Sequence, residues 1–133
     1  MINRVEKLSL LSEMIAFAKY DKDMKNIEYN FLLGVAKQLE ISRADFEYLI
    51  EHPVTYTHLK SHSERIVQFH RLVLLMNIDS GNSSSGVIKL YNFGLRMGLS
   101  HESITKVLYL MESFPNKIVP PDVLIDIFKT QNN

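Results

Sequence analysis

Apolar residues recur along most of the chain at intervals of three or four positions, the period of an α-helix with one buried face. In the first such segment, residues 4–20, the side chains of Val5, Leu8 and Leu11 fall on one stripe. The same period predicts further helices over residues 26–40, 42–52, 63–78, 87–97, 100–111 and 121–130. Residues 53–60 are rich in β-branched side chains but have no second segment to pair with as a strand. The expected fold class is therefore all-α.

The helical pattern occurs twice. Residues 21–42 align without a gap with residues 79–100, at an offset of 58 positions (79 minus 21). At this offset apolar residues correspond at Leu32 and Leu90, Val35 and Phe93, Leu39 and Met97, Ile41 and Leu99, Phe46 and Ile104, and Leu49 and Val107. Because a half of this length cannot bury its own apolar face, the two halves are expected to share one core.

The offset also predicts how the domain is organised. A single domain is expected over residues 1–133, because the length is ordinary for one domain and the 46% hydrophobic content can fill one core. Repeat one is expected over about residues 4–52, the crossover over residues 53–61 and repeat two over about residues 62–112. A short C-terminal helix over about residues 121–130 would follow the second repeat.

Several helix ends are predicted from residues that favour the first or last position of a helix. Ser42 and Ser100 are expected to cap the helices that follow them, since a serine hydroxyl accepts a hydrogen bond from a free amide of the first turn. Gly98 is a predicted helix stop, and Pro53 ends the third helix. Gly34, inside the second helix, is interpreted as a point of close packing.

Charge and composition exclude several classes of function. The chain has 15 basic and 15 acidic residues and a net charge of zero, so neither a nucleic-acid partner nor an anionic membrane surface is expected. It contains no cysteine, which fits a reducing compartment. No apolar run approaches the roughly 20 residues that span a bilayer, and the first residues, which include Glu6 and lead into an amphipathic segment, do not resemble a signal peptide. We therefore expect a cytoplasmic protein without membrane insertion.

Short motifs in both halves resemble those of the tellurite-resistance TerB-like family, over about residues 4–112. The matching residues are Ala18-Lys19-Tyr20-Asp21-Lys22-Asp23-Met24, then Glu28, Leu32, Ala36, Leu39 and Ile41-Ser42, with Asp79 and Gly98-Leu99-Ser100 in the second half. The resemblance implies an all-α fold of two three-helix repeats related by a pseudo-two-fold axis. It also implies a role in tellurite resistance or another bacterial stress response.

Family resemblance further implies an acidic metal site, at Asp21, Asp23 and Glu28. Three carboxylates suit a hard divalent cation, and Ca²⁺ fits best, although no cofactor is certain. Two departures stand in the same loop, Lys22 and Lys25, whose ammonium groups could neutralise the carboxylates. In the alternative interpretation, Asp21 and Asp23 are turn residues and Glu28 stabilises the start of the following helix.

Histidines offer a second arrangement for a metal ion. His58 and His62 are four positions apart, a spacing that can bind Zn²⁺ on a helix, with Glu64 or His70 as a distant third ligand. The alternative is that these histidines are solvated or pack at the edge of the core. No motif for a catalytic serine, a phosphate-binding loop or a cysteine nucleophile is present in the sequence.

Together these features predict a non-enzymatic TerB-like helical binding module with an unidentified protein partner. Divalent-metal sensing through the acidic loop is the more specific version of this hypothesis. Two alternatives remain open: an enzyme with a cleft between the two repeats, and a protein-interaction scaffold that binds no metal.

Overall fold

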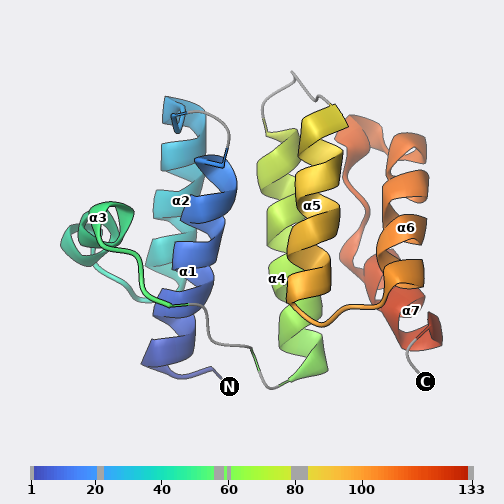
Figure 1. The fold of residues 1–133 in the computed structure, drawn as a ribbon, viewed down its shortest axis with the longest axis horizontal. Helices are drawn as coiled ribbons and strands as arrows, with labels where there is room; N and C mark the ends of the chain where they lie inside the picture. The colour runs from blue at the N-terminus through green and yellow to red at the C-terminus, as the bar shows by residue number, and fades with distance from the viewer. Residues whose placement is uncertain (1, 21–22, 56–58, 60, 79–83, 132–133) are drawn as a thin grey trace. The chain divides into compact units, whose positions relative to one another are not determined.

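The computed structural model describes residues 2–20, 23–55, 59, 61–78 and 84–131, the side chains of residues 84, 85, 130 and 131 excepted. These residues form seven α-helices and two short 3₁₀ helices, with no strand among them, so the predicted all-α class is confirmed for this part of the chain (Figure 1). The elements are α1 (Arg4–Ala18), α2 (Asn26–Gln38), α3 (Arg43–Glu51), α4 (His62–Asn77), α5 (Ser84–Arg96), α6 (His101–Leu110), η1 (Met111–Ser113), η2 (Pro115–Lys117) and α7 (Pro121–Gln131).

Contacts divide the chain into two compact units, which we describe separately. Unit 1 is Met1–Leu59 and unit 2 is Lys60–Asn133, so the border falls inside the predicted crossover, residues 53–61. Unit 1 contains the three helices of the first predicted repeat, whereas unit 2 contains those of the second and the C-terminal helix α7. The expectation of one domain with a shared core stays a prediction.

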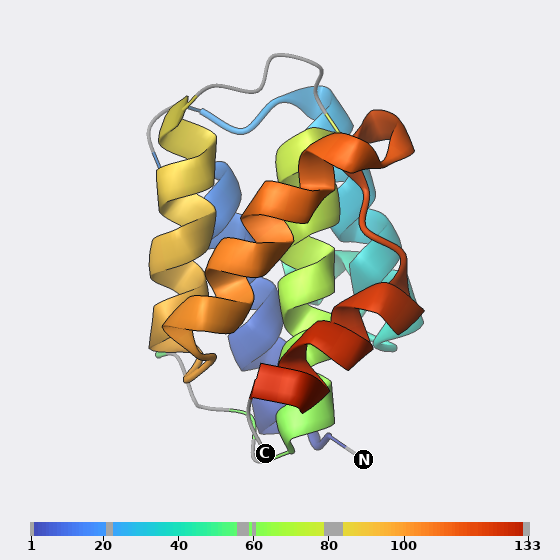
Figure 2. The ribbon, with the colours of Figure 1, turned by 90° about the vertical axis from the view of Figure 1, so that its right-hand side faces the viewer.

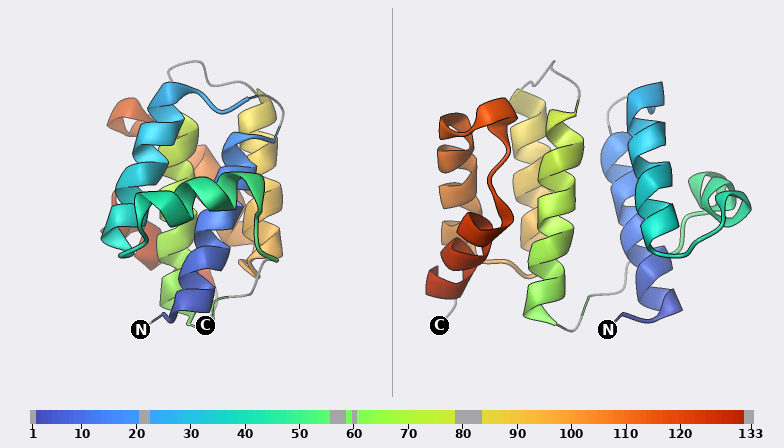
Figure 3. Two further views of the ribbon diagram at one scale, coloured as in Figure 1. Left: turned by 90° about the vertical axis from the view of Figure 1, so that its left-hand side faces the viewer. Right: turned by 180° about the vertical axis from the view of Figure 1, so that it is seen from behind.

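In unit 1, α1 and α2 form an antiparallel pair and α3 lies across them (Figure 3). The core includes Phe17 of α1, Leu32 of α2 and Phe46 of α3, each at most 2% exposed. Tyr29 of α2 places its ring 5.4 Å from that of Phe46. Aromatic and aliphatic packing of this kind is the main source of stability in a small helical unit.

In unit 2, α4 and α5 are neighbours, α6 packs on α5, and α7 packs on both α4 and α6 (Figure 2). The ring of Phe128 on α7 meets Phe69 of α4 edge to face at 5.7 Å, and both side chains are fully buried. The two 3₁₀ helices form the corner between α6 and α7. Asn77 at the end of α4 holds this corner by donating from Nδ2 to the Lys117 carbonyl oxygen, 2.9 Å away.

Helix bounds agree with the 58-residue offset. The first residues of α4, α5 and α6 (62, 84 and 101) lie 58 positions after those of α1, α2 and α3 (4, 26 and 43). Packing of the third helix nevertheless differs between the units, because α3 contacts both α1 and α2, whereas α6 packs on α5 and α7. Internal duplication therefore remains a prediction that the matching bounds support.

Both central helices end in a Schellman motif. After α2, the Ile41 amide donates to the Ala36 carbonyl oxygen at 2.8 Å, around a left-handed Glu40 with a φ of 60°. After α5, the Leu99 amide donates to the carbonyl oxygen of residue 94 at 3.1 Å, around Gly98 with a φ of 82°. The predicted stop at Gly98 is confirmed, and its counterpart in unit 1 uses a non-glycine residue in a conformation that glycine favours.

The predicted serine caps are also confirmed. The Ser42 hydroxyl accepts from the Asp45 amide at 3.1 Å, and the Ser100 hydroxyl accepts from the Ser103 amide at 3.1 Å. Each hydroxyl satisfies an amide that has no partner inside its helix. Local sequence is sufficient to specify where α3 and α6 begin.

Two predictions about glycines and helix bounds need correction. A Cβ on Gly34 would meet no atom within 4 Å, so Gly34 is not a point of close packing. That role belongs to Gly94, where a Cβ would lie 2.7 Å from Cδ1 of Ile104 and 2.9 Å from Cε1 of Phe69. In addition, α5 begins at residue 84 rather than 87, so Ser84, Ser85 and Gly86 belong to the helix.

Candidate functional site

Of the three predicted metal ligands, one lies outside the described residues and another is engaged in a helix cap. Asp21 is the residue outside, and Asp23 is exposed to solvent. Glu28 is only 6% exposed, and its Oε1 accepts from the amide of Lys25, the N-cap residue of α2, at 2.8 Å. This bond is the role that the alternative interpretation assigned to Glu28.

The histidines predicted as zinc ligands are only partly described. His58 lies outside the described residues, while His62 and His70 are half-buried on α4, eight positions apart. Their Nε2 atoms are buried without a hydrogen-bond partner among the described residues, and His62 lies edge-on to Phe128, with ring centroids 6.4 Å apart. Within the described part of the chain, no group of three His, Cys, Asp or Glu side chains could hold a metal ion.

Burial has an electrostatic effect at His70. The desolvated surroundings of the ring lower its pKa, and the nearby Arg71 guanidinium lowers it further by charge repulsion. Arg71 is itself held against Gln68, whose Oε1 accepts from Nη1 at 3.3 Å. His70 is therefore a half-buried side chain of unit 2 whose surroundings disfavour its charged form.

A network of polar side chains links α2 to α3 on the surface of unit 1. The Tyr29 hydroxyl donates to Glu47 Oε1 at 2.5 Å, and Arg43 Nε lies 3.4 Å from the same oxygen. The hydrogen bond from Tyr29 is the main cause that lowers the pKa of Glu47, followed by the bond from Arg43. All three groups are used in joining the two helices, which gives the network a structural role.

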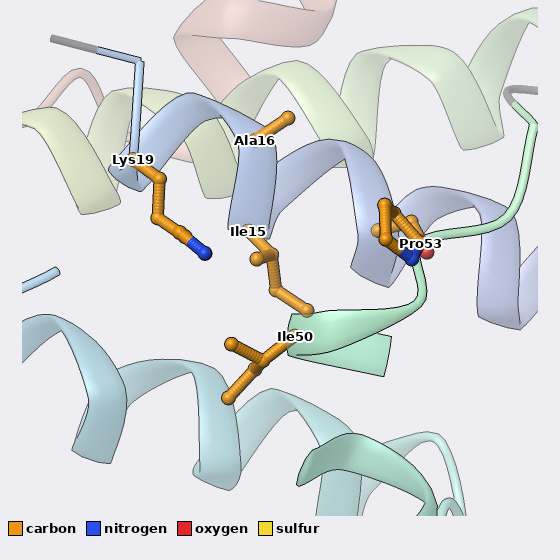
Figure 4. Close-up of a pocket in the computed structure, with 6 residues that line it drawn as sticks. Ile15, Ala16, Lys19, Ile50 and Pro53 are labelled. Atoms are coloured by element: carbon orange, nitrogen blue, oxygen red, sulfur yellow. The ribbon is translucent and has the colours of Figure 1, made fainter. Parts of the chain in front are cut away.

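Unit 1 also contains a pocket between α1 and the end of α3, with a volume of about 230 Å³ (Figure 4). It is lined by Ser12, Ile15, Ala16, Lys19, Ile50 and Pro53. Figure 4 shows Ile15 of α1 and Ile50 of α3 facing one another, with the Lys19 side chain extending beside them. The walls are mainly apolar, and the polar groups come from Ser12 and Lys19 alone.

The polar groups of the pocket differ in burial. Ser12 is 4% exposed, and its hydroxyl oxygen accepts from the Val54 amide at 3.2 Å, which fixes the chain after Pro53 against α1. Lys19 is exposed at the end of α1 and forms no ion pair with a described residue. The pocket therefore combines apolar walls with one ammonium group that forms no ion pair with the part of the chain that the structure describes.

In unit 2, the neighbouring helices α5 and α6 each carry large apolar side chains that are exposed to solvent. Ile88 and Leu95 of α5 are 60% and 41% exposed, and Tyr109 of α6 is 78% exposed. Ile88 and Leu95 are seven positions apart and so lie on the same face of the helix. We call these three residues the α5–α6 apolar surface.

Sequence reasoning did not identify the pocket. Ser12 was assigned no role, and Lys19 was named only among the motif residues of the first half. The available signal was the seven-residue spacing between these two polar residues, which puts them on the same side of the first helix.

Comparison with known proteins does not identify a family. No protein-family model, curated protein or solved structure matches the chain. Among the described residues, no helix combines the length and the apolar character needed to cross a membrane.

Proposed function

We propose that this protein is a non-enzymatic helical binding module and that its partner is another protein. The observation that supports this proposal is the α5–α6 apolar surface, because Ile88 and Tyr109 expose most of their side chains to solvent. Large aliphatic and aromatic side chains provide most of the binding energy at the centre of protein interfaces. The net charge of zero favours such an apolar contact over binding to a polyanion.

The finer version of the proposal is a TerB-like protein of the bacterial cytoplasm that acts in a stress or tellurite-resistance-type response. It is supported by the motif residues of the first half and by their partial recurrence in Gly98-Leu99-Ser100. The common 58-residue offset of the helix starts supports an internal duplication of three helices. An enzyme with a cleft between the two repeats is the alternative that this proposal sets aside.

The partner proposal is tested by changing the surface without disturbing the core. The double variant Ile88→Glu with Leu95→Glu places two charges on the exposed face of α5, and should abolish partner capture from a bacterial lysate by the immobilised protein. Ile125→Glu is a matched control in the same unit, since Ile125 is 47% exposed on α7. Capture that is the same for all three proteins would show that the α5–α6 apolar surface is not the binding surface.

Metal sensing is retained as a separate proposal for Asp21, Asp23 and Glu28. If these carboxylates hold Ca²⁺, calorimetry should show binding by the wild type at millimolar Ca²⁺ and none by the double variant Asp21→Asn with Asp23→Asn. Bound Ca²⁺ should also stabilise the fold by about 2.7 kcal/mol at one hundred times its dissociation constant. Absence of binding heat in the wild type for Ca²⁺, Mg²⁺ and Zn²⁺ would leave Glu28 as a helix cap and remove metal from the proposed function.

A further inference from the structure

We propose that the pocket of unit 1 binds a small carboxylate with an apolar body, such as a medium-chain fatty acid, with its carboxylate at Lys19. The apolar body would lie along Ile15 and Ile50. This inference concerns a different unit from the α5–α6 apolar surface and does not depend on the partner proposal. Nothing in the sequence interpretation assigns a ligand to these residues.

The spacing of the lining residues on α1 fits an elongated ligand. Ser12 and Lys19 are seven positions apart, and Ile15 and Ala16 lie between them on the same side of the helix. Seven residues of an α-helix extend about 10 Å along its axis. A chain of about eight carbons has a comparable length, so its two ends would reach the two ends of the pocket.

The end of α3 and the hydrogen bond that follows it fix the positions of the two pocket walls. α3 ends at Glu51, and the chain leaves the helix at His52, because Pro53 cannot continue it. The Val54 amide then bonds to the buried hydroxyl of Ser12 at 3.2 Å, which holds this segment against α1. The pocket of about 230 Å³ therefore has one wall from α1 and one from the end of α3.

The charges of the pocket select the ligand class. Lys19 supplies an ammonium group that has no ion pair with a described residue, which favours a ligand with one negative group. Ile15, Ala16, Ile50 and Pro53 offer no hydrogen-bonding side chains, so a sugar or a nucleotide would leave its polar groups unsatisfied. A carboxylate at the exposed rim and an apolar body in the interior satisfy both conditions.

Ser12 adds a second polar group at the opposite end. Its hydroxyl oxygen already accepts from Val54, and its proton has no acceptor among the described residues. The proton is therefore able to bond to an oxygen on the far end of a ligand. A hydroxy or keto group near the end of the apolar chain is expected to improve binding.

Octanoate is a suitable probe, with octanol as its uncharged counterpart. Titration of the 133-residue chain should shift backbone amide signals in residues 12–19 and 50–54, Pro53 excepted, and octanol should bind more weakly than octanoate. Lys19→Gln should weaken octanoate binding by about twofold to fivefold, the effect of one exposed ion pair, and leave octanol binding unchanged.

A second variant tests the pocket itself. Ala16→Leu adds a branched side chain at an exposed position of the pocket wall and should abolish binding of both probes without loss of helical content. The inference is overturned if octanoate shifts signals mainly outside these two segments, or if octanol and octanoate bind equally. It is also overturned if neither Lys19→Gln nor Ala16→Leu changes octanoate binding in a protein that remains folded.

Discussion

Gly34 lies in α2 and Gly94 in α5, and the space around the two glycines differs. A Cβ on Gly34 would enter open space, whereas a Cβ on Gly94 would lie within 3 Å of both Ile104 and Phe69. Gly94→Ala should therefore lower the free energy of unfolding by about 1 to 3 kcal/mol through overpacking. Gly34→Ala is the matched control and should raise it by about 0.5 to 1 kcal/mol, because alanine favours the helix. Urea unfolding of both variants measures the difference, and equal effects would contradict the packing of α4, α5 and α6.

Glu40 and Gly98 occupy the same position of two Schellman motifs, with φ values of 60° and 82°. A left-handed conformation costs a non-glycine residue about 1 to 2 kcal/mol. Glu40→Gly should therefore stabilise the protein, by about 0.5 to 1 kcal/mol after allowance for the greater freedom of glycine in the unfolded chain. Thermal denaturation measures this effect.

Gly98→Ala provides the reverse comparison. It introduces the same conformational cost, and its Cβ would lie 2.8 Å from Nη1 of Arg65, so it should destabilise the protein. A destabilising Glu40→Gly would show that the Glu40 side chain forms contacts that outweigh backbone strain.

His70 should make the stability depend on pH. Burial and then Arg71 lower its folded-state pKa below the unfolded value of about 6.5. Below pH 6.5 the unfolded chain therefore binds a proton more readily than the folded protein, and stability falls as the pH is lowered toward the folded-state pKa. The contribution is fully present above about pH 6.5.

The measurement compares the wild type with His70→Gln, which removes the titration and keeps a polar side chain of similar length. The loss of stability between about pH 7.5 and about pH 5.5 should be smaller in the variant. An unchanged pH dependence would show that the His70 ring is protonated equally in the folded and unfolded states.

At the scale of the helices, the residues that directly follow α2 and α5 are buried at corresponding positions. Leu39 is 7% exposed and Met97 is fully buried, as the repeated pattern predicted. Leu39→Ala and Met97→Ala should each lower the free energy of unfolding by about 2 to 5 kcal/mol, because both truncate a side chain in a packed interior. Lys37→Ala, an exposed change in the last turn of α2, is the control and should have little effect. Near-neutral melts for both core variants would mean that these residues do not support the core.

At the scale of the whole molecule, the prediction concerns cooperativity. If the two halves share a core, as the repeat suggests, urea should unfold both units in one transition. Amide signals of Leu32 in unit 1 and Leu90 in unit 2 are suitable reporters, since both residues are fully buried. Midpoints that differ between these reporters would show that the two units fold independently.

Sequence alone was sufficient for features that depend on near neighbours. Helix period predicted the seven α-helices of the described residues to within a few positions, and serine caps predicted the starts of α3 and α6. Gly98 predicted the end of α5 because a left-handed residue completes the cap there. All these features rest on hydrogen bonds and contacts between residues up to about five positions apart.

Tertiary structure decided the features that depend on distant residues. The packing of α7 on α4 and α6, the close approach at Gly94 and the corner held by Asn77 and Lys117 involve partners far apart in the sequence. The pocket is likewise lined by residues of α1 and of the segment at the end of α3, which the bond from Val54 to Ser12 joins across 42 positions. A single sequence specifies which faces are apolar, but it does not state which faces meet, because that depends on how side chains of many helices fill space together.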